Sequence, residues 1–243
     1  MPWDSEAPPA VDSKPVWELY DLTHDYSQSQ NLAAREPQKL AELQAAYHQA
    51  ALQNQVIEPE GTQGQAPRPF VTAGRRHFVY YNSAMRYSRY AFASIMNTSW
   101  QATAVVDVPP GNPDGALVAQ GGWLVGWGLY IIGGKTQFIY KATGQRRDML
   151  RLVAPDALVA GHHEISVAFS YDGGGIGKGG KAELLVDGHE VAGGRLERTF
   201  GALIPNEGGA SIGGDYGTTL TDDYRSPFTY PGTIEKVTID LVR

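Results

Sequence analysis

Residues 163–188 read HEISVAFSYDGGGIGKGGKAELLVDG and contain two alternating runs on either side of a glycine-rich segment. In the first run Ile165, Val167 and Phe169 alternate with polar or small residues, and 182–186 alternates in the same way. Successive side chains of a strand point to opposite faces, so a period of two places each apolar set against a core. The glycines supply the positive φ angles that a chain reversal needs. We therefore predict that this stretch is the central antiparallel hairpin of a β-sandwich.

The chain beyond residue 70 consists mostly of short segments of this kind. Turn sequences such as PPGNPDG and PNEGG separate them. Evenly spaced strands with such turn signals and no helical windows are typical of a sandwich or barrel. The fold class expected is therefore mainly β. We expect strands at 77–81, 101–108, 116–121, 127–132, 136–141, 148–153, 163–171, 181–187, 189–193, 210–213 and 233–242.

The N-terminal part has a different pattern. Residues 16–22 (VWELYDL) alternate briefly, which predicts a short strand. Further along, Leu40 and Leu43 belong to an apolar set at helical spacing, in a segment rich in Ala, Leu, Gln and Glu. Pro37 suits the first turn of a helix, because its missing N–H has no partner there. A helix is therefore expected over 36–54, with an apolar face that needs a partner.

These patterns divide the chain into parts of different composition. Proline and acidic residues dominate the first part, and proline, glycine and glutamine are frequent in the third, as in a linker. The expected parts are a loose arm at 1–15, a strand and helix at 16–57, a linker at 58–69 and a sandwich at 70–243.

The overall composition narrows the classes of function. The chain has 243 residues, of which 42% are hydrophobic and 19% charged, and its net charge is −6. An acidic chain without a dense cluster of Lys and Arg argues against a nucleic-acid or anionic-membrane surface. The first residues lack the basic and apolar regions of a signal peptide. The absence of cysteine excludes disulfides, thiolate metal sites and cysteine nucleophiles.

Two polar motifs have both a functional and a structural interpretation. Residues 175–180 (GIGKGG) fit the dinucleotide-binding pattern, but that site needs a helix after the turn and a strand follows in this sequence. A hairpin turn is the favoured interpretation. Asp215, Asp222 and Asp223 lie in GGDYGTTLTDDY and carry oxygen atoms of the kind that Ca²⁺ binds. A structural Ca²⁺ site is one hypothesis, solvated loop carboxylates are the favoured one, and no other cofactor is expected.

Aromatic residues offer another kind of site, a platform on which sugar rings stack. Trp127 shares a strand face with Leu129 and Ile131, so it is expected in the core. Trp123 lies in the turn QGGWLVGWG and is the best candidate for exposure. Trp123 and Tyr216 are the candidate carbohydrate-binding residues. The aromatic residues that could form such a platform are Trp100, Trp123, Trp127, Tyr130, Tyr140 and Tyr216.

Several passages, taken together, resemble the C-terminal region of the large bacterial arylsulfatases. WELYDLTHDYSQSQNLA and KLAELQAAYHQAA resemble a small subdomain in which a strand and a helix pack on the catalytic domain. LVAQGGWLVGWGLYI, VAFSYDGGGIGKGG, ELLVDGHEVAGGRLERT and YPGTIEKVTIDL resemble the sandwich that follows it. The passages keep that order from about Trp17 to Leu241. The resemblance implies a lectin-like antiparallel sandwich of the concanavalin and laminin-G type, a jelly roll, behind a short strand and helix.

The catalytic half of that family has no counterpart in this sequence. Those sulfatases use a formylglycine made in a C/S-x-P-x-R motif of an N-terminal α/β domain, together with a set of metal ligands, and neither occurs in this chain. The leading hypothesis is a non-catalytic accessory region, inactive alone, whose partner is a sulfatase catalytic domain in trans. No catalytic residue is assigned. Its location would be the bacterial cytoplasm, or the periplasm if it is exported with that partner.

Two further hypotheses remain open. One is a free-standing carbohydrate-binding module of concanavalin-like fold, with Trp123 as its main contact to a glycan. The other is self-association through the 36–54 helix, because an exposed apolar stripe tends to find a partner.

Overall fold

The computed structural model of the chain describes residues 16–54, 72, 74–82, 86–88, 90–111, 113–201, 204 and 209–242. The chain divides into two compact units, Met1–Arg68 and Pro69–Arg243. The arm expected at 1–15 and the linker expected at 58–69 lie outside the described residues.

The described part of the first unit consists of one helix and the segment before it. Helix α1 spans Pro37–Gln53 and has its proline in the first turn, as predicted. The prediction of a strand at 16–22 is wrong, because these residues have no strand conformation and pair with no strand in the described part of the chain. The backbone N–H of Leu19 donates to Asn31 Oδ1 at 3.1 Å, and its carbonyl accepts from the Leu32 N–H at 2.7 Å. A side chain and a loop therefore satisfy the backbone groups that a neighbouring strand would satisfy in a sheet.

Few apolar side chains of this unit are buried. Trp17 lies edge-on against Tyr47 of helix α1, with ring centroids 5.4 Å apart. Ala51 is the buried residue of the helix, whereas Leu43 and Leu52 remain exposed. Among the described residues, no helix combines the length and the apolar character needed to cross a membrane.

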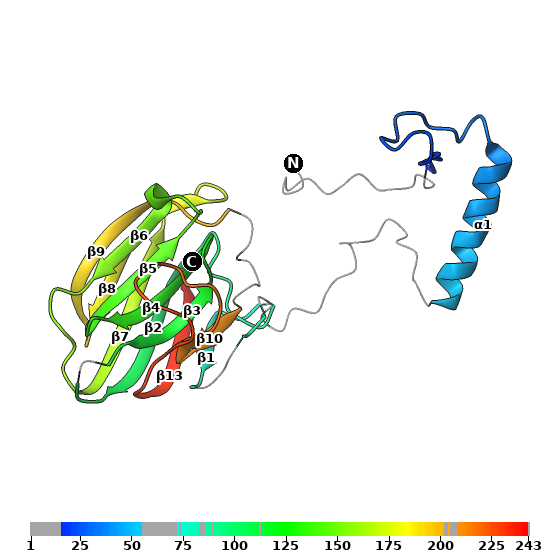
Figure 1. Ribbon diagram of the computed structural model, residues 1–243. Coiled ribbons are helices and arrows are strands. Elements are labelled where there is room, and N and C mark those ends of the chain that lie inside the picture. The colour runs from blue at the N-terminus through cyan, green and yellow to red at the C-terminus, as the bar shows by residue number, and fades with distance from the viewer. Residues whose placement is uncertain are drawn as a thin grey trace. The chain divides into compact units, whose positions relative to one another are not determined.

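The second unit is built from two β-sheets (Figure 1). The six-stranded sheet has the order β1-β13-β2-β7-β8-β9, and all its neighbouring strands are antiparallel. Its strands are β1 (His77–Tyr80), β2 (Ser99–Val108), β7 (Gly161–Tyr171), β8 (Lys178–Val186), β9 (His189–Arg198) and β13 (Thr233–Val242).

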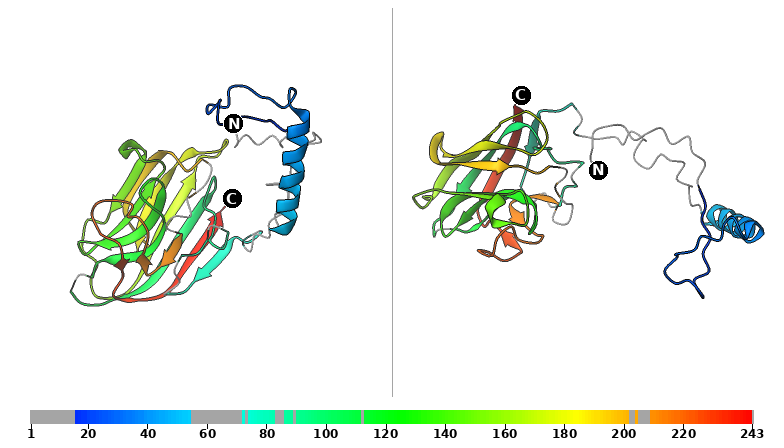
Figure 2. Two further views of the ribbon diagram at one scale, coloured as in Figure 1. Left: turned by 45° about the vertical axis from the view of Figure 1, so that its right-hand side comes forward. Right: turned by 90° about the horizontal axis from the view of Figure 1, so that it is seen from above.

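The seven-stranded sheet has the order β11-β12-β3-β4-β5-β6, with β10 paired to β3. It is antiparallel apart from a short parallel pairing of Thr229 with Ala116. Its strands are β3 (Gly115–Gly121), β4 (Gly126–Ile132), β5 (Lys135–Lys141), β6 (Met149–Val153), β10 (Ala210–Ile212), β11 (Gly214–Asp215) and β12 (Phe228–Thr229). Figure 2 shows the two sheets as separate layers of one sandwich, which confirms the predicted fold class.

The main core lies between the two sheets. Trp100 of β2 and Trp127 of β4 are both buried, with ring centroids 5.0 Å apart. In the β7–β8 hairpin, Val167 pairs with Leu184 and both are fully buried, so the predicted hairpin is confirmed. Burial of one such side chain contributes about 1.5–3 kcal/mol. A slip of one residue would move each apolar set to the opposite face, so the alternation fixes the register.

A second apolar cluster covers the outward face of the seven-stranded sheet. Tyr130 and Ile139, which alternate with core-facing neighbours along β4 and β5, pack with Leu220 and Tyr224. The latter two residues come from loop 216–227, which connects β11 to β12. The centre of this sheet is therefore buried on both faces. Loop 216–227 stands over the sheet and forms one wall of the site described next.

Candidate functional site

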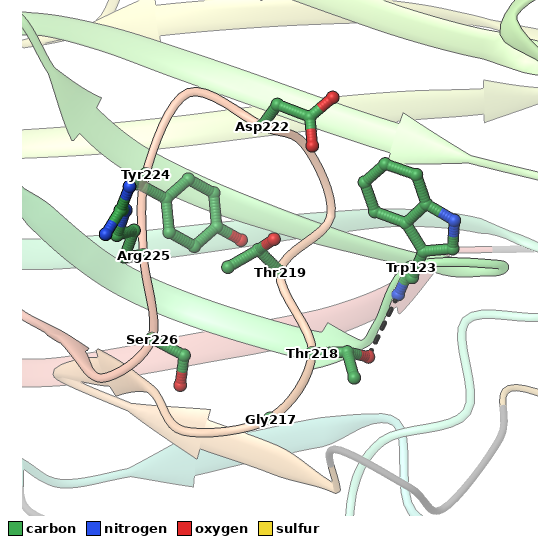
Figure 3. A pocket seen from close by; sticks show the side chains of 8 residues that line it. All are labelled: Trp123, Gly217, Thr218, Thr219, Asp222, Tyr224, Arg225 and Ser226. Carbon is green, nitrogen blue, oxygen red and sulfur yellow. Dashed lines mark hydrogen bonds between the residues drawn. The ribbon is translucent and has the colours of Figure 1, made fainter.

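Two adjacent hollows lie where loop 216–227 meets the turn between β3 and β4. The larger hollow has a volume of about 590 Å³ and the smaller one about 400 Å³, both within the usual range of ligand sites. Trp123 and Asp222 line both of them. The larger hollow is lined by Trp123, Gly217, Thr218, Thr219, Asp222, Tyr224, Arg225 and Ser226 (Figure 3). The smaller one is lined by Trp123, Lys141, Gly144, Arg146, Met149, Arg151, Leu220, Thr221, Asp222 and Asp223.

Glycines in the QGGWLVGWG turn allow the loop to approach this closely. A Cβ atom on Gly122 would lie 2.2 Å from Thr218 Oγ1, and one on Gly126 would lie 2.6 Å from a methyl carbon of Leu220. Neither position has room for a side chain. The same Thr218 Oγ1 accepts a hydrogen bond from the Trp123 N–H at 3.1 Å, the dashed line of Figure 3. The glycines and this hydrogen bond hold Trp123 at the edge of the loop.

Trp123 covers the side chain of Lys141. Trp123 remains 47% exposed as a residue, and the Lys141 ammonium lies over its ring at 4.2 Å from the centroid. Lys141 is only 6% exposed, and its Nζ donates to the Leu220 carbonyl at 3.1 Å. Burial lowers the pKa of Lys141, and the nearby Asp222 carboxylate opposes that shift. The pair thus presents an aromatic ring and a largely desolvated cation to the same hollow.

Arg151 stands beside Lys141 and has a different role. Its Nε and Nη2 donate to Gln137 Oε1 at 2.9 and 2.8 Å, and its Nη1 donates to Asp223 Oδ2 at 2.8 Å. These contacts fix the guanidinium plane. Arg146, from the one-turn 3₁₀ helix η1 (Arg146–Asp148), is exposed at the rim of the same hollow.

A buried hydrogen-bond network fastens loop 216–227 to the sheet. The Tyr224 hydroxyl donates to Asp215 Oδ2 at 2.6 Å, lies 3.1 Å from the Tyr130 hydroxyl and accepts from the Leu220 N–H at 3.0 Å. Burial raises the pKa of Asp215 above its ordinary value. Burial also raises the pKa of both tyrosines, so their hydroxyls stay protonated and available as donors. The network holds Leu220 where the buried Lys141 ammonium can reach its carbonyl.

The predicted site residues do not all come together. Trp123 is exposed at the hollows as expected, and Asp222 and Asp223 lie beside it. Tyr216 does not line either hollow: its ring lies over Gly214, where a Cβ atom would be 2.6 Å from the ring carbons. Asp215 is buried under the loop, in contact with the Tyr224 hydroxyl.

This arrangement gives the hypothesis of a Ca²⁺ site at Asp215, Asp222 and Asp223 no geometric support. Asp215 is engaged by Tyr224, and Asp223 by Arg151. Among the residues that the structure describes, no group of three or more His, Asp or Glu side chains could hold a metal ion.

The other aromatic candidates belong to the interior. Trp100, Trp127, Tyr130 and Tyr140 are all buried, and Trp127 donates its indole N–H to Gln120 Oε1 at 2.8 Å. The residues that sequence reasoning missed are Lys141, Arg151 and Thr218. The alternation along β5 and β6 was a usable signal for the two cations, because it places both on the outward face.

Two motifs with catalytic or nucleotide-binding patterns are structural. The first half of GIGKGG, residues 175–177, ends the turn between β7 and β8, and its second half begins β8 at Lys178, so the predicted hairpin turn is confirmed. The segment 209–213 reads GASIG, a match to the serine nucleophile pattern G-x-S-x-G. Its Ser211 is buried in β10, and its hydroxyl accepts from the Arg86 N–H at 3.1 Å. It does not stand exposed at a strand-to-helix turn, as that nucleophile must.

Solved structures with a similar arrangement of strands include several sandwiches from other proteins. The CBM40 of the Ruminococcus gnavus IT-sialidase, bound to α2,3-sialyllactose, is 16% identical over 70% of this chain and 92% of its own, with a TM-score of 0.49. Mouse laminin α1 domains LG4-5 are 15% identical over 69% of this chain, with a TM-score of 0.41, and this chain covers 39% of theirs. The leech intramolecular trans-sialidase is 14% identical over 68% of this chain and 26% of its own, with a TM-score of 0.44.

At these sequence identities the likeness concerns the arrangement of strands alone. No protein-family model and no curated protein matches the chain. The resemblance to arylsulfatases therefore stays a prediction.

Proposed function

We propose that the sandwich is a carbohydrate-binding module and that Trp123 is its main contact to the glycan. The observation that carries the proposal is the half-exposed indole ring held between two hollows that polar side chains line. An aromatic face supplies the apolar contact area that a sugar ring needs, and a few fixed polar groups supply orientation. Hydroxyl groups of Thr218, Thr219 and Ser226 line the larger hollow and can both donate to and accept from sugar hydroxyls.

The backbone around Trp123 is preorganised. The Thr218 hydroxyl, the close-packed glycines and the Tyr224 network fix both walls before any ligand arrives. Preorganisation of this kind reduces the entropy lost on binding. Fixed walls also allow the site to select one sugar geometry over others.

The test is a glycan array probed with the full chain and with Trp123→Ala. We expect the substitution to abolish binding to every glycan that the wild-type protein retains. Leu124→Ala is the matched control, because Leu124 is exposed in the same turn but lines neither hollow. Equal binding by Trp123→Ala and wild-type protein, or flat titrations of all glycans, would refute the proposal.

The arylsulfatase resemblance supports a second proposal for residues 16–57. Helix α1 carries the exposed apolar side chains of Leu43, Tyr47 and Leu52, which suits docking on a larger domain. On this proposal the chain is inactive toward aryl sulfates alone and binds a sulfatase catalytic domain in trans. Turnover of an aryl sulfate by the purified chain would exclude the accessory role. Light scattering distinguishes the alternative of self-association through the helix, which requires a mass above that of one chain.

A further inference from the structure

We infer that the glycan carries an anionic group, a carboxylate or a sulfate, and that Lys141 in the smaller hollow is its principal contact. The inference rests on the proposed function and names the class of sugar. The charges at the two hollows support it, as do two buried polar side chains of the smaller hollow, Lys141 and Thr221.

The first observation is the state of Lys141. Its side chain is almost completely buried, yet it forms no ion pair with any carboxylate among the described residues. It contacts the Leu220 carbonyl and the face of the Trp123 ring. Buried charges in proteins are normally paired, because an unpaired charge loses its hydration without compensation. An anionic group in the smaller hollow would supply the missing partner.

The second observation is the charge around the hollows. Four cations line them, namely Lys141, Arg146, Arg151 and Arg225, against the two carboxylates of Asp222 and Asp223. The Asp223 carboxylate is already bound to Arg151. The site is therefore locally positive in a chain whose net charge is −6. A locally positive hollow on an acidic protein concentrates anionic ligands at that position.

The Asp222 carboxylate limits where the anion can lie. It is exposed, lines both hollows and forms no hydrogen bond with a described residue. Because like charges repel, an anion bound to Lys141 must keep away from the Asp222 carboxylate. Asp222 remains available to accept hydrogen bonds from neutral sugar hydroxyls.

Thr221 adds a third observation. It lines the smaller hollow, is buried, and its hydroxyl has no hydrogen-bond partner among the described residues. A buried hydroxyl without a partner is uncommon in native structures. A carboxylate or sulfate bound to the Lys141 ammonium offers further acceptor oxygens, and the Thr221 hydroxyl reaches one of them only by turning about its χ1 bond, because that oxygen is enclosed in this structure.

These observations assign different parts of the ligand to the two hollows. The larger hollow, where several hydroxyl groups accompany a single cation, Arg225, and the Asp222 carboxylate, takes the neutral part of the sugar. The smaller hollow takes the acidic substituent. Because Trp123 lines both hollows, it contacts both the neutral part and the acidic substituent of the ligand.

The experiment compares sugars with and without an acidic group. Lactose sulfate and the uronic-acid form of cellobiose differ from their parent sugars in that group alone, whereas sialyllactose adds a whole acidic sugar residue to lactose. The full chain is titrated with lactose, sialyllactose and lactose sulfate, and with cellobiose and its uronic-acid form, at low and high salt. We expect the acidic members to bind roughly tenfold or more tightly than their neutral counterparts, as for one charge-assisted hydrogen bond. High salt should reduce that preference. Comparison of the carboxylated and sulfated members distinguishes the two sources of the anion.

Lys141→Met tests the assignment to this residue, because methionine keeps an unbranched apolar chain in the buried space. Acidic sugars should lose roughly tenfold in affinity or more and neutral sugars should not. Lys135→Met is the matched control, since Lys135 lies on the same strand outside both hollows. Should Lys141→Met fail to fold, Lys141→Gln, which also removes the charge and keeps an unbranched chain, is titrated in its place.

The outcomes separate the two proposals. Equal binding of neutral and acidic members by wild-type protein overturns this inference and leaves the carbohydrate-binding function in place. Retention of the acidic preference by Lys141→Met overturns the role of Lys141. Absence of binding by every member, together with a flat glycan array, overturns the proposed function itself.

Discussion

The ammonium of Lys141 lies 4.2 Å from the centroid of the Trp123 ring. This contact joins β5 to the turn between β3 and β4, and it buries a cation that would otherwise face water. A cation over an aromatic face contributes about 0.5–2 kcal/mol, more when it is desolvated. The ring therefore acts on the Lys141 ammonium in two opposite ways, since its π face attracts the cation and its bulk excludes water.

Trp123→Ala is expected to raise the pKa of Lys141 toward its ordinary value. The ring desolvates the ammonium, and desolvation is the main cause of the lowered pKa, so removal of the ring readmits water. An NMR titration of the lysine side-chain signals measures the shift. Trp17→Ala, which alters the other unit of the chain, should leave that titration unchanged. An unaltered Lys141 pKa in Trp123→Ala would show that the ring does not control its solvation.

Gly122→Ala is expected to destabilise the protein by about 1–3 kcal/mol, the usual cost of an overpacked site. The added Cβ atom would lie 2.2 Å from Thr218 Oγ1, so the loop or the turn must move. Urea denaturation measures the change. Gly201→Ala is the matched control, because a Cβ atom there meets no neighbour within 4 Å and the φ angle is not positive. Equal stability of the two variants would mean that the loop is not held against the turn.

The hairpin and the strands of the sandwich could be predicted from the sequence because their signals are local. Alternation over a few residues located β7, β8 and β13, and β13 has the predicted bounds of 233–242. Strand β9 was predicted to end at residue 193, where the pair Gly193 and Gly194 resembles a turn. In the structure the strand continues to Arg198. In the structure a Cβ atom on Gly194 would lie 2.8 Å from a methyl carbon of Leu150. This glycine therefore allows close packing between the sheets and does not end the strand.

The candidate site could be predicted only in part, because its two sides are far apart in sequence. The exposure of Trp123 followed from its place in a glycine-rich turn. The contact of Lys141 with Leu220 joins residues 79 positions apart, and no local pattern reports it. The prediction of a strand at 16–22 was wrong for a related reason, because alternation gives no information on whether a partner strand exists.

Tyr224→Phe is expected to destabilise the protein by about 1–3 kcal/mol. It removes the hydroxyl that donates to Asp215 and accepts from the Leu220 N–H, and both groups are then left without that partner in a buried site. Chemical denaturation measures the loss. Tyr216→Phe is the control, since the Tyr216 hydroxyl forms no hydrogen bond with a described residue. A Tyr224→Phe variant as stable as the control would show that the network does not fasten the loop.

Asp215→Asn is expected to change how stability depends on pH. Burial raises the folded-state pKa of Asp215 above its ordinary value of 3.8, so the folded protein retains this proton to higher pH than the unfolded chain. The favourable contribution is therefore fully present below the ordinary pKa and is lost as the pH rises through the raised pKa. Asparagine has no ionisation to lose, so it removes this part of the pH dependence.

The difference in unfolding free energy between wild-type protein and Asp215→Asn is the quantity to measure, in urea at a series of pH values. Other carboxylates, such as Asp172 beside Arg195, have a lowered pKa and act in the opposite direction, but they cancel in the difference. The variant should gain stability relative to wild-type protein as the pH rises above the ordinary aspartate pKa. Parallel curves across that range would mean that Asp215 titrates alike in the folded and unfolded states, and that its burial under loop 216–227 carries no energetic consequence.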